Sequence, residues 1–351
     1  MQRSSADSHV LVNARVLSVP SNGQKRVAEE ILRRLNGVEL ASPPGALASG
    51  LRGHAWEQLV LPMIARGRNL WSPSTTGPVR HPRHVVTVHD IAFVDSPEWF
   101  SRSFAMLYDL VVGQLVQHAR HIVAVSDFTR RRLIEHYRAD PNRVTTIYSG
   151  SSVIFRRMPV DVVATTLQRL DVPDAPYLVA FLGHDPRKNL ARIVEAWRGV
   201  SARWPEARLV TFGRSSNAKV FAAAKIEAPP SSVVHVGPVS DEDLACLYAG
   251  SAGLVFPSLY EGFGLPVIEA AACGARVLTS NISALPEISP RDAILVDPLS
   301  IIEIAAGMEA MLATATTDDA SAVASRIASV ARFDWDAAAA EHADLFKKVF
   351  A

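Results

Sequence analysis

Short apolar runs alternate with amphipathic stretches along most of this chain, and the alternation predicts strands separated by helices. Residues 10–16 form the first apolar run, and residues 24–35 follow with Val27, Ile31 and Leu35 on one helical face. The first half also contains expected strands at 84–89, 121–125 and 144–148, and expected helices at 104–118 and 127–137. Strands that alternate with helices form a parallel sheet covered by helices on both faces.

The same pattern restarts near residue 177. It predicts strands at 177–182, 208–212, 233–236, 254–256, 274–279 and 293–296, and helices at 190–200, 241–249 and 334–350. We therefore predict two Rossmann-like α/β domains, at 1–170 and 171–333, followed by a C-terminal helix at 334–351. Ligands of parallel sheets bind at the carboxyl ends of the strands, so two facing sheets would hold a site in the cleft between the domains.

Composition narrows the class of protein. The 351 residues suffice for about two domains, and contents of 48% hydrophobic and 20% charged residues are typical of a soluble globular protein. A net charge of +1 gives no reason to expect nucleic acid as a partner. Residues 1–8 lack the apolar run of a signal peptide, and no stretch of about 18 apolar residues occurs. We expect a cytoplasmic protein whose two cysteines, Cys246 and Cys273, are reduced core thiols.

The segment LVFPSLYEGFGLPVIEA at 254–270 carries the most chemical information. An apolar strand runs through a glycine-rich turn into a helix, and Pro266 suits the first helical turn because no intrahelical N–H bond is lost there. The turn would leave the backbone N–H groups of Phe263, Gly264 and Leu265 free at the positive end of the helix dipole. Such a position attracts phosphate.

Two glutamates flank this turn, Glu261 before it and Glu269 inside the helix, with seven residues between them. A carboxylate beside an anion cradle is a poor phosphate ligand but a good acceptor for a hydroxyl group. The expected ligand therefore combines an anion with a polyol, as a nucleotide-sugar does.

A second motif, GHDPRKNL at 183–190, follows the expected strand at 177–182. Adjacent cations at the carboxyl end of a strand can neutralise a diphosphate, Arg187 as a fork that binds two oxygens and Lys188 as a compact charge. We expect both side chains to be exposed. The alternative is a solvated basic turn, which the anion-binding turn at 262–265 makes less attractive.

Two further positions lie where a ligand could be met. His89 ends the expected strand at 84–89, where a histidine is as often structural as functional, and both interpretations stay open. Gly23 follows the first strand and opens the first helix, where a loop N–H could reach a phosphate.

Other interpretations of these motifs fit less well. Gly262 and Gly264 could begin a dinucleotide fingerprint, but Val267 stands where its third glycine belongs. A purely structural turn would leave both flanking glutamates unexplained. The two Asp-x-Asp patterns, at 241–243 and 334–336, stand at expected helix starts and indicate capping rather than metal binding.

Together these residues resemble the retaining glycosyltransferases of family 4, which have the two-domain GT-B fold, and the resemblance covers nearly the whole chain. Its most specific part is the pair of glutamates at 261 and 269, and the basic motif PRKN at 186–189 matches as well. The segments VNAR at 12–15, GQKR at 23–26, LWSP at 70–73, VHD at 88–90 and SDFT at 126–129 are similar to the bacterial mannosyl- and rhamnosyltransferase branch of polysaccharide biosynthesis.

The resemblance implies a role for each candidate residue. Glu269 would hold the donor ribose, and Arg187 and Lys188 would bind the diphosphate. The transferring sugar would be contacted by Glu261 and by the backbone of Phe263, Gly264 and Leu265, and His89 would face it from the N-terminal, acceptor-binding domain. Gly23 would contact the donor, and Val236 and Gly237 would lie by the base. The last helix would cross back onto the N-terminal domain. Two departures from the family pattern occur: the first loop reads Asn22-Gly23-Gln24 instead of a double glycine, and His184 is the nearest candidate for an additional basic residue.

The function implied by the resemblance is retaining hexosyl transfer from a nucleotide-diphosphate sugar to a glycan or lipid-linked acceptor, without a metal or other cofactor. The alternative is a catalytically silent nucleotide-sugar-binding protein, which donor turnover would distinguish. The basic run at 130–132 leaves open whether that helix meets an anionic membrane surface peripherally or is a solvated face.

Overall fold

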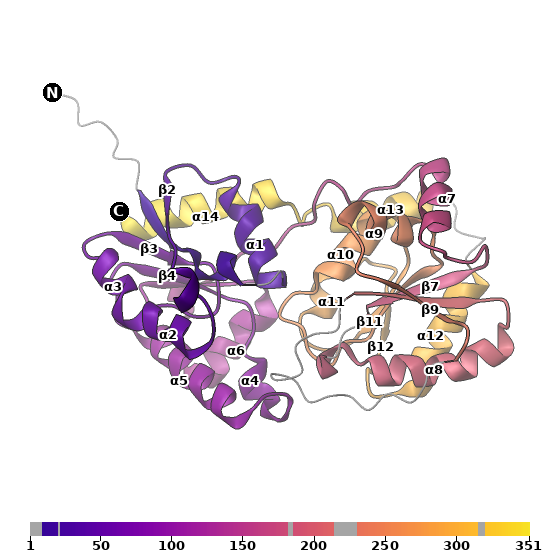
Figure 1. The fold of residues 1–351 in the computed structure, drawn as a ribbon, viewed down its shortest axis with the longest axis horizontal. Coiled ribbons are helices and arrows are strands. Elements are labelled where there is room, and N and C mark those ends of the chain that lie inside the picture. Colours follow the sequence, from indigo (N-terminus) through magenta and orange to yellow (C-terminus); the bar gives the residue numbers. More distant parts are fainter. Residues whose placement is uncertain (1–8, 20–21, 182–184, 214–229, 315–319) are drawn as a thin grey trace. The chain divides into compact units, whose positions relative to one another are not determined.

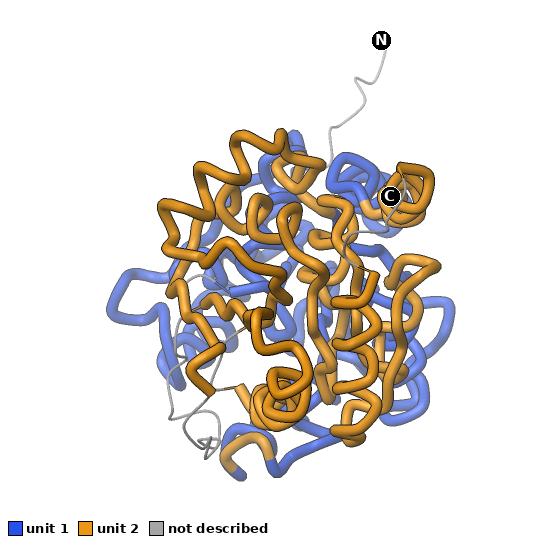
Figure 2. Tube along the Cα trace, turned by 90° about the vertical axis from the view of Figure 1, so that its right-hand side faces the viewer, with its two compact units in different colours: residues 1–98, 102–150, 334–351 blue, residues 99–101, 151–333 orange. Residues whose placement is uncertain are grey.

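The computed structural model describes residues 9–19, 22–181, 185–213, 230–314 and 320–351 (Figure 1). The chain forms two compact α/β units, which Figure 2 distinguishes by colour. Unit 1 comprises residues 1–98, 102–150 and 334–351, and unit 2 comprises residues 99–101 and 151–333.

Unit 1 is built on a six-stranded parallel sheet of order β2-β1-β3-β4-β5-β6. The strands are β1 (Val10–Asn13), β2 (Val38–Ala41), β3 (Asn69–Ser72), β4 (His84–Val88), β5 (His121–Ala124) and β6 (Val144–Thr146). The inner strands are buried at almost every residue, as continuous apolar runs in a sheet covered on both faces should be. The helices are α1 (Gly23–Leu32), α2 (Gly50–Leu59), α3 (Leu61–Ile64), α4 (Ala92–Asp95), α5 (Arg102–His118), α6 (Asp127–Tyr137) and α14 (Trp335–Phe350).

The C-terminal helix α14 belongs to unit 1 and lies beside α1 (Figure 1). The Asp334 carboxylate caps the helix by accepting the Ala337 N–H at 2.9 Å. The rings of His342 and Phe346 pack against Trp71 of β3, with centroid distances of 5.3 and 5.5 Å. The amphipathic face of α14 therefore completes the core of unit 1.

Unit 2 repeats the architecture with a parallel sheet of order β12-β11-β10-β7-β8-β9. Its strands are β7 (Tyr177–Phe181), β8 (Arg208–Phe212), β9 (Val233–Gly237), β10 (Gly253–Phe256), β11 (Val277–Ser280) and β12 (Ile294–Val296). Its helices are α7 (Val160–Arg169), α8 (Leu190–Arg203), α9 (Asp241–Gly250), α10 (Leu265–Ala272), α11 (Leu285–Ile288), α12 (Ile301–Ala313) and α13 (Ala320–Val330). The core is apolar and gathers around Trp197, Leu209, Val255, Leu278 and Met308.

Both sheets have a point at which successive connections leave in opposite directions. In unit 1 this point lies between β1 and β3, and in unit 2 it lies between β7 and β10. Loops that follow such a pair of strands diverge and leave a crevice at the carboxyl edge of the sheet, where ligands of open α/β sheets bind. The strand order therefore predicts one ligand-binding position in each unit, at the carboxyl ends of β1 and β3 in unit 1 and of β7 and β10 in unit 2.

The predicted α/β class is confirmed, and every expected strand is present, although several are shorter than predicted. The first ends at Asn13 because this side chain accepts the Arg15 N–H at 3.3 Å and starts a short 3-10 helix, Ala14–Ser18. The strand expected at 274–279 begins at Val277, since Gly274, with φ of +86°, belongs to the turn that closes α10. Strands β2 and β3 and helices α2, α7, α12 and α13 were not among the predicted elements.

The predicted domain boundary at residue 170 differs from the division of the chain, which falls after Gly150. Helix α7 lies before residue 170 but packs against α9 and belongs to unit 2. The chain passes between the units again after Phe333, and the Ser151 N–H donates to the Phe333 carbonyl at 2.9 Å. A Cβ on Gly150 would come within 2.4 Å of the Trp335 nitrogen, so the two chain segments that connect the units lie side by side.

Candidate active site

The strongest cluster of predicted residues lies at the β7/β10 position of unit 2. The loop after β7 carries Lys188, and the loop after β10 carries Glu261. The Lys188 ammonium lies 2.5 Å from Glu261 Oε1, and the two side chains are only 19% and 13% exposed. The ammonium also lies 5.0 Å from the ring centre of Phe256 and 6.0 Å from that of Phe181. The aromatic faces and the carboxylate hold this cation in a fixed place.

Arg187 is held by a neighbouring carboxylate that the sequence prediction did not use. Its guanidinium bonds Asp185 through Nε at 3.1 and 3.0 Å and through Nη2 at 2.7 Å. The guanidinium lies 5.9 Å from the ring centre of Phe100. Both cations were expected to be exposed, but the Arg187 and Lys188 side chains are each only 19% exposed. The expectation was wrong because each cation folds onto a carboxylate.

Asn189 fixes the loop after β7 to its neighbours, and sequence reasoning gave it no role. Its backbone has a φ of +60°, and its side-chain amide donates to the carbonyls of Pro257 at 2.9 Å and Pro298 at 2.7 Å. It is 3% exposed. One buried amide thus joins the loops after β7, β10 and β12. Its position beside the Arg-Lys pair and the αL tolerance of asparagine were the available signals.

The turn into α10 has a backbone conformation that favours glycine. Gly264 has a φ of +113°, and a Cβ there would come within 2.8 Å of Leu285 Cδ2. No described residue accepts a hydrogen bond from the backbone N–H of Gly264 or Leu265. Phe263 is 7% exposed and packs edge-on against Phe333 at 5.7 Å. The helix N-terminus therefore presents N–H groups from a packed turn, which suits an anion.

The two glutamates of the motif differ sharply in environment. Glu261 accepts an N–H bond from Ala284 at its backbone carbonyl and donates its own N–H to Ser283 Oγ at 3.2 Å, so the loop holds its backbone. Glu269 is 3% exposed within α10. Burial, with the Glu269 carboxylate as a second cause, raises the pKa of the Cys273 thiol. Cys273 and Cys246 are both buried and free, as predicted.

The remaining predicted residues of unit 2 stand farther along the sheet. Val236 and Gly237 end β9, which is separated from β7 by β8. Gly237 has a φ of +75° and accepts the Gly213 N–H at 2.9 Å. His184 lies outside the described residues.

The other predicted residues, Gly23 and His89, belong to unit 1. Gly23 is the first residue of α1, and Asn22 caps that helix by accepting the Lys25 N–H at 2.9 Å. His89 follows β4 and is 9% exposed, with Nε2 at 2.9 Å from the Pro73 carbonyl. Burial lowers the pKa of His89, although the Pro73 carbonyl and the Asp90 charge act in the opposite direction. A neutral ring that donates from Nε2 keeps Nδ1 as an acceptor.

Residues 176–314 match the family described as Glycosyl transferases group 1, and residues 53–152 match the Glycosyltransferase Family 4 description. The chain belongs to glycosyltransferase family 4.

The relatives of this family 4 glycosyltransferase include two mannosyltransferases from Escherichia coli. The O-antigen chain mannosyltransferase B is 29% identical over 283 residues, which are 78% of this chain and 71% of the relative. The serotype-specific mannosyltransferase WbdA is 30% identical over 231 residues, which are 62% of this chain and 28% of that much longer protein.

Solved structures share the fold over nearly the whole chain. Anabaena HepE in complex with UDP has a TM-score of 0.72 at 16% identity and covers 97% of this chain and 99% of its own. WaaG, a glycosyltransferase involved in lipopolysaccharide biosynthesis, has a TM-score of 0.69 at 14% identity, with coverage of 96% and 99%. The glycosyltransferase therefore has the GT-B fold.

The acidic patterns of this glycosyltransferase stand at the starts of the helices α9 and α14. Ser240 accepts the Asp243 N–H at 3.1 Å at the start of α9, and Asp243 pairs with Arg169. Asp336 pairs with Arg34 on unit 1. Among the described residues, no group of three or more histidine, cysteine or acidic side chains is arranged to hold a metal ion.

The basic run on α6 is largely engaged within unit 1. Arg130 donates to the carbonyls of Val144 and Pro141, and Arg132 pairs with Asp95 and Glu135. Two of its three cations thus have partners of their own, which favours the interpretation as an ordinary helix face. Across the described ranges, no helix combines the length and apolar character needed to cross a bilayer.

Proposed function

We propose that this glycosyltransferase moves a mannose- or rhamnose-like hexosyl residue from a nucleotide-diphosphate sugar to a glycan or lipid-linked acceptor of a surface polysaccharide. The proposal further holds that the anomeric configuration is retained and that no metal ion or other cofactor is needed. Mannose is favoured because the relatives from Escherichia coli are named O-antigen chain and serotype-specific mannosyltransferases.

One observation carries the proposal: the loops after β7 and β10 bring Arg187, Lys188, Glu261 and the start of α10 to the reversal point of one sheet. Two cations and a helix N-terminus supply positive charge for a diphosphate. Glu261 and Glu269 supply carboxylate acceptors for hydroxyl groups of sugar and ribose. This set of groups matches a ligand that is part anion and part polyol.

The ion pairs suggest how the donor is received. Lys188 is bonded to Glu261, and Arg187 to Asp185. A diphosphate carries more charge than a carboxylate and would draw both cations towards itself. The Glu261 carboxylate released by this exchange would then be available to the transferring sugar. Binding would thus convert two internal ion pairs into donor contacts.

During transfer, the bond between the anomeric carbon and the diphosphate oxygen breaks, and negative charge collects on the leaving group. Arg187, Lys188 and the N–H groups of Gly264 and Leu265 would stabilise that charge. The acceptor oxygen bonds to the anomeric carbon on the same face, and its proton passes to the departing phosphate. His89, neutral and buried, would present Nδ1 to a sugar hydroxyl.

The test uses purified protein, GDP-mannose and a mannose oligosaccharide acceptor. We expect GDP release that depends on the acceptor, a product with the anomeric configuration of the donor by NMR, and full activity in excess EDTA. UDP-glucose serves as the control donor. Binding of GDP-mannose without turnover would instead support a nucleotide-sugar-binding protein, and loss of activity in EDTA would overturn the metal-independent part.

A further inference from the structure

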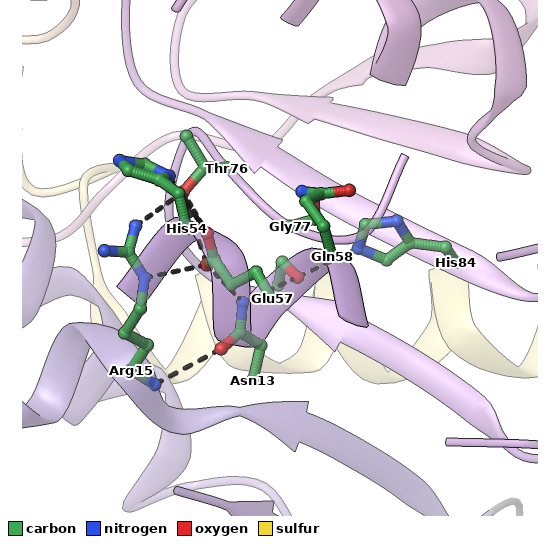
Figure 3. A network of polar contacts seen from close by, with 9 residues as sticks. Asn13, Arg15, His54, Glu57, Gln58, Thr76, Gly77 and His84 are labelled. Carbon is green, nitrogen blue, oxygen red and sulfur yellow. Dashed lines mark hydrogen bonds and ion pairs between the residues drawn. The ribbon is translucent and has the colours of Figure 1, made fainter. Parts of the chain in front are cut away.

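A buried polar network fills the reversal point of the sheet in unit 1, and none of the proposed donor contacts uses it (Figure 3). Asn13 and Ser72 end the neighbouring strands β1 and β3, and Glu57 enters between their loops from α2. All three side chains are 0% exposed. Figure 3 shows Asn13, Arg15, His54 and Thr76 directed towards the Glu57 carboxylate.

Glu57 uses both carboxylate oxygens in this network. Oε1 lies 2.8 Å from Asn13 Nδ2 and 2.9 Å from Arg15 Nε. Oε2 lies 3.1 Å from Thr76 Oγ1 and 3.3 Å from His54 Nδ1. Burial opposes ionisation, but the bond from His54, the Arg15 charge and the Asn13 amide outweigh it and lower the pKa of Glu57.

The partners of Glu57 hold the segment that follows β3. Arg15 Nη2 donates to Thr76 Oγ1 at 2.8 Å, so Thr76 is fixed by both members of the ion pair. The next helical residue, Gln58, donates to the Gly77 carbonyl at 2.8 Å and accepts the Val79 N–H at 3.1 Å. Helix α2 thus fixes the segment at consecutive points.

The same segment holds His89. The His89 backbone N–H donates to Thr75 Oγ1 at 3.2 Å, and its ring nitrogen Nε2 bonds the Pro73 carbonyl at 2.9 Å. Residues 73–76 therefore lie between the Glu57–Arg15 pair on one side and the His89 backbone and ring on the other. Thr75 and Thr76 are 4% and 2% exposed, so solvent cannot replace these contacts.

The chemistry of the Glu57–Arg15 ion pair indicates that the pair fixes the position of neighbouring groups rather than raising the stability of the fold. A buried ion pair gives up the hydration of both charges and often contributes no more than apolar residues of the same volume would. It does enforce one geometry, because any shift leaves a buried charge without its partner. An imidazole whose Nδ1 must meet a sugar hydroxyl benefits from such a constraint, since misplacement by about 1 Å can cost on the order of 10²-fold in rate.

We propose that Glu57, together with Arg15, is a positioning residue that sets the place of the His89 ring through residues 73–76. The inference rests on the proposed function, in which His89 meets the transferring sugar. It assigns to the α2 helix a part in transfer that does not require contact with substrate.

A double-mutant cycle tests the proposal, with kcat and donor KM measured for each variant. Glu57→Gln should lower kcat by at least about 10-fold in the wild-type background, as a displaced contact does. In a His89→Asn background the same change should have little further effect on kcat, because the group that it positions is already gone. Thr76→Val, which keeps the side-chain shape but breaks the link, should behave the same way and replaces Glu57→Gln if that variant does not fold.

Glu39→Gln is the matched control, since Glu39 forms an exposed pair with Arg68 and lies on β2, an edge strand of the same sheet. Its kcat should equal that of the wild type. Losses that add in full in the double variants would overturn the positioning role while leaving the proposed function intact. Normal kcat in His89→Asn alone would overturn both the positioning role and the part given to His89 in transfer.

Discussion

At the scale of single residues, Arg187 and Lys188 of the proposed donor site are bonded to Asp185 and Glu261. Once the diphosphate has drawn both cations to itself, their charge is in place before the bond to the sugar breaks and stabilises the leaving group. We therefore expect Lys188→Ala and Arg187→Ala each to lower kcat by on the order of 10²–10³. Steady-state kinetics with Arg203→Ala as control, an exposed arginine paired with Glu309, would check this. Turnover near normal in both site variants would make the motif a structural turn.

Changing Glu261 and Glu269 to glutamine should have different effects on kcat and on the donor KM. Glu269 is buried and is proposed to hold the ribose, which changes little during reaction, so Glu269→Gln should mainly raise the donor KM. Glu261 is proposed to touch the sugar ring that gains positive charge, so Glu261→Gln should mainly lower kcat. The change also frees Lys188 from its carboxylate, which should tighten rather than weaken diphosphate binding. Equal rises in KM with unchanged kcat would restrict both residues to donor binding.

Buried histidines predict how stability depends on pH. Burial lowers the pKa of His342 to about 4, below its ordinary value of 6.5. The unfolded chain therefore binds a proton that the folded chain excludes, and stability falls as pH drops from 6.5 towards 4. For one such histidine the loss between pH 7 and pH 5 is about 2 kcal/mol. Urea unfolding at both values should show a smaller loss in His342→Gln than in the wild type, and an unchanged difference would contradict the shift.

At the scale of elements, the start of α10 depends on a conformation that only glycine adopts easily. An alanine at position 264 would be strained at a φ of +113° and would meet Leu285. We expect Gly264→Ala to destabilise unit 2 by about 1–3 kcal/mol and to raise the donor KM. Gly199→Ala in α8 is the control, because a Cβ there meets nothing within 4 Å. It should stabilise the helix by up to about 1 kcal/mol. Equal thermal unfolding of the two variants would disprove the strain.

At the scale of the whole molecule, the last helix is separated from the rest of unit 1 by residues 151–333 of unit 2. Helix α14 buries Trp335, Phe346 and Phe350 in unit 1. Removing residues 334–351 should therefore unfold unit 1 and spare unit 2. Hydrogen exchange should show lost protection in β1 and β3 with retained protection in β7 and β10. Retained protection in all four strands would show that α14 is dispensable for the core.

The local pattern determined most of the sheet. Continuous apolar strands such as 177–181 and 208–212 were predicted almost to the residue, because burial on both faces demands unbroken apolar runs. The short strand β2, with exposed Glu39 and Leu40, was not predicted, because an edge strand has only one neighbour and needs no apolar run. The predicted boundary at residue 170 assigned residues 160–169 to the first domain, whereas they form α7 of unit 2, because the contacts of α7 with α9 lie far along the chain.

For the site, the sequence by itself determined the residue types and their place after strands: a glycine turn before a helix, two glutamates, and an Arg-Lys pair. It could not determine which charges are paired or which loops meet. The approach of Lys188 to Glu261, the clamp of Asn189 and the buried Glu57 network all depend on strand order, which joins segments up to 109 residues apart in these contacts. Local propensity acts over a few residues, whereas pairing between distant loops is decided only when the sheets form and bring their carboxyl edges together.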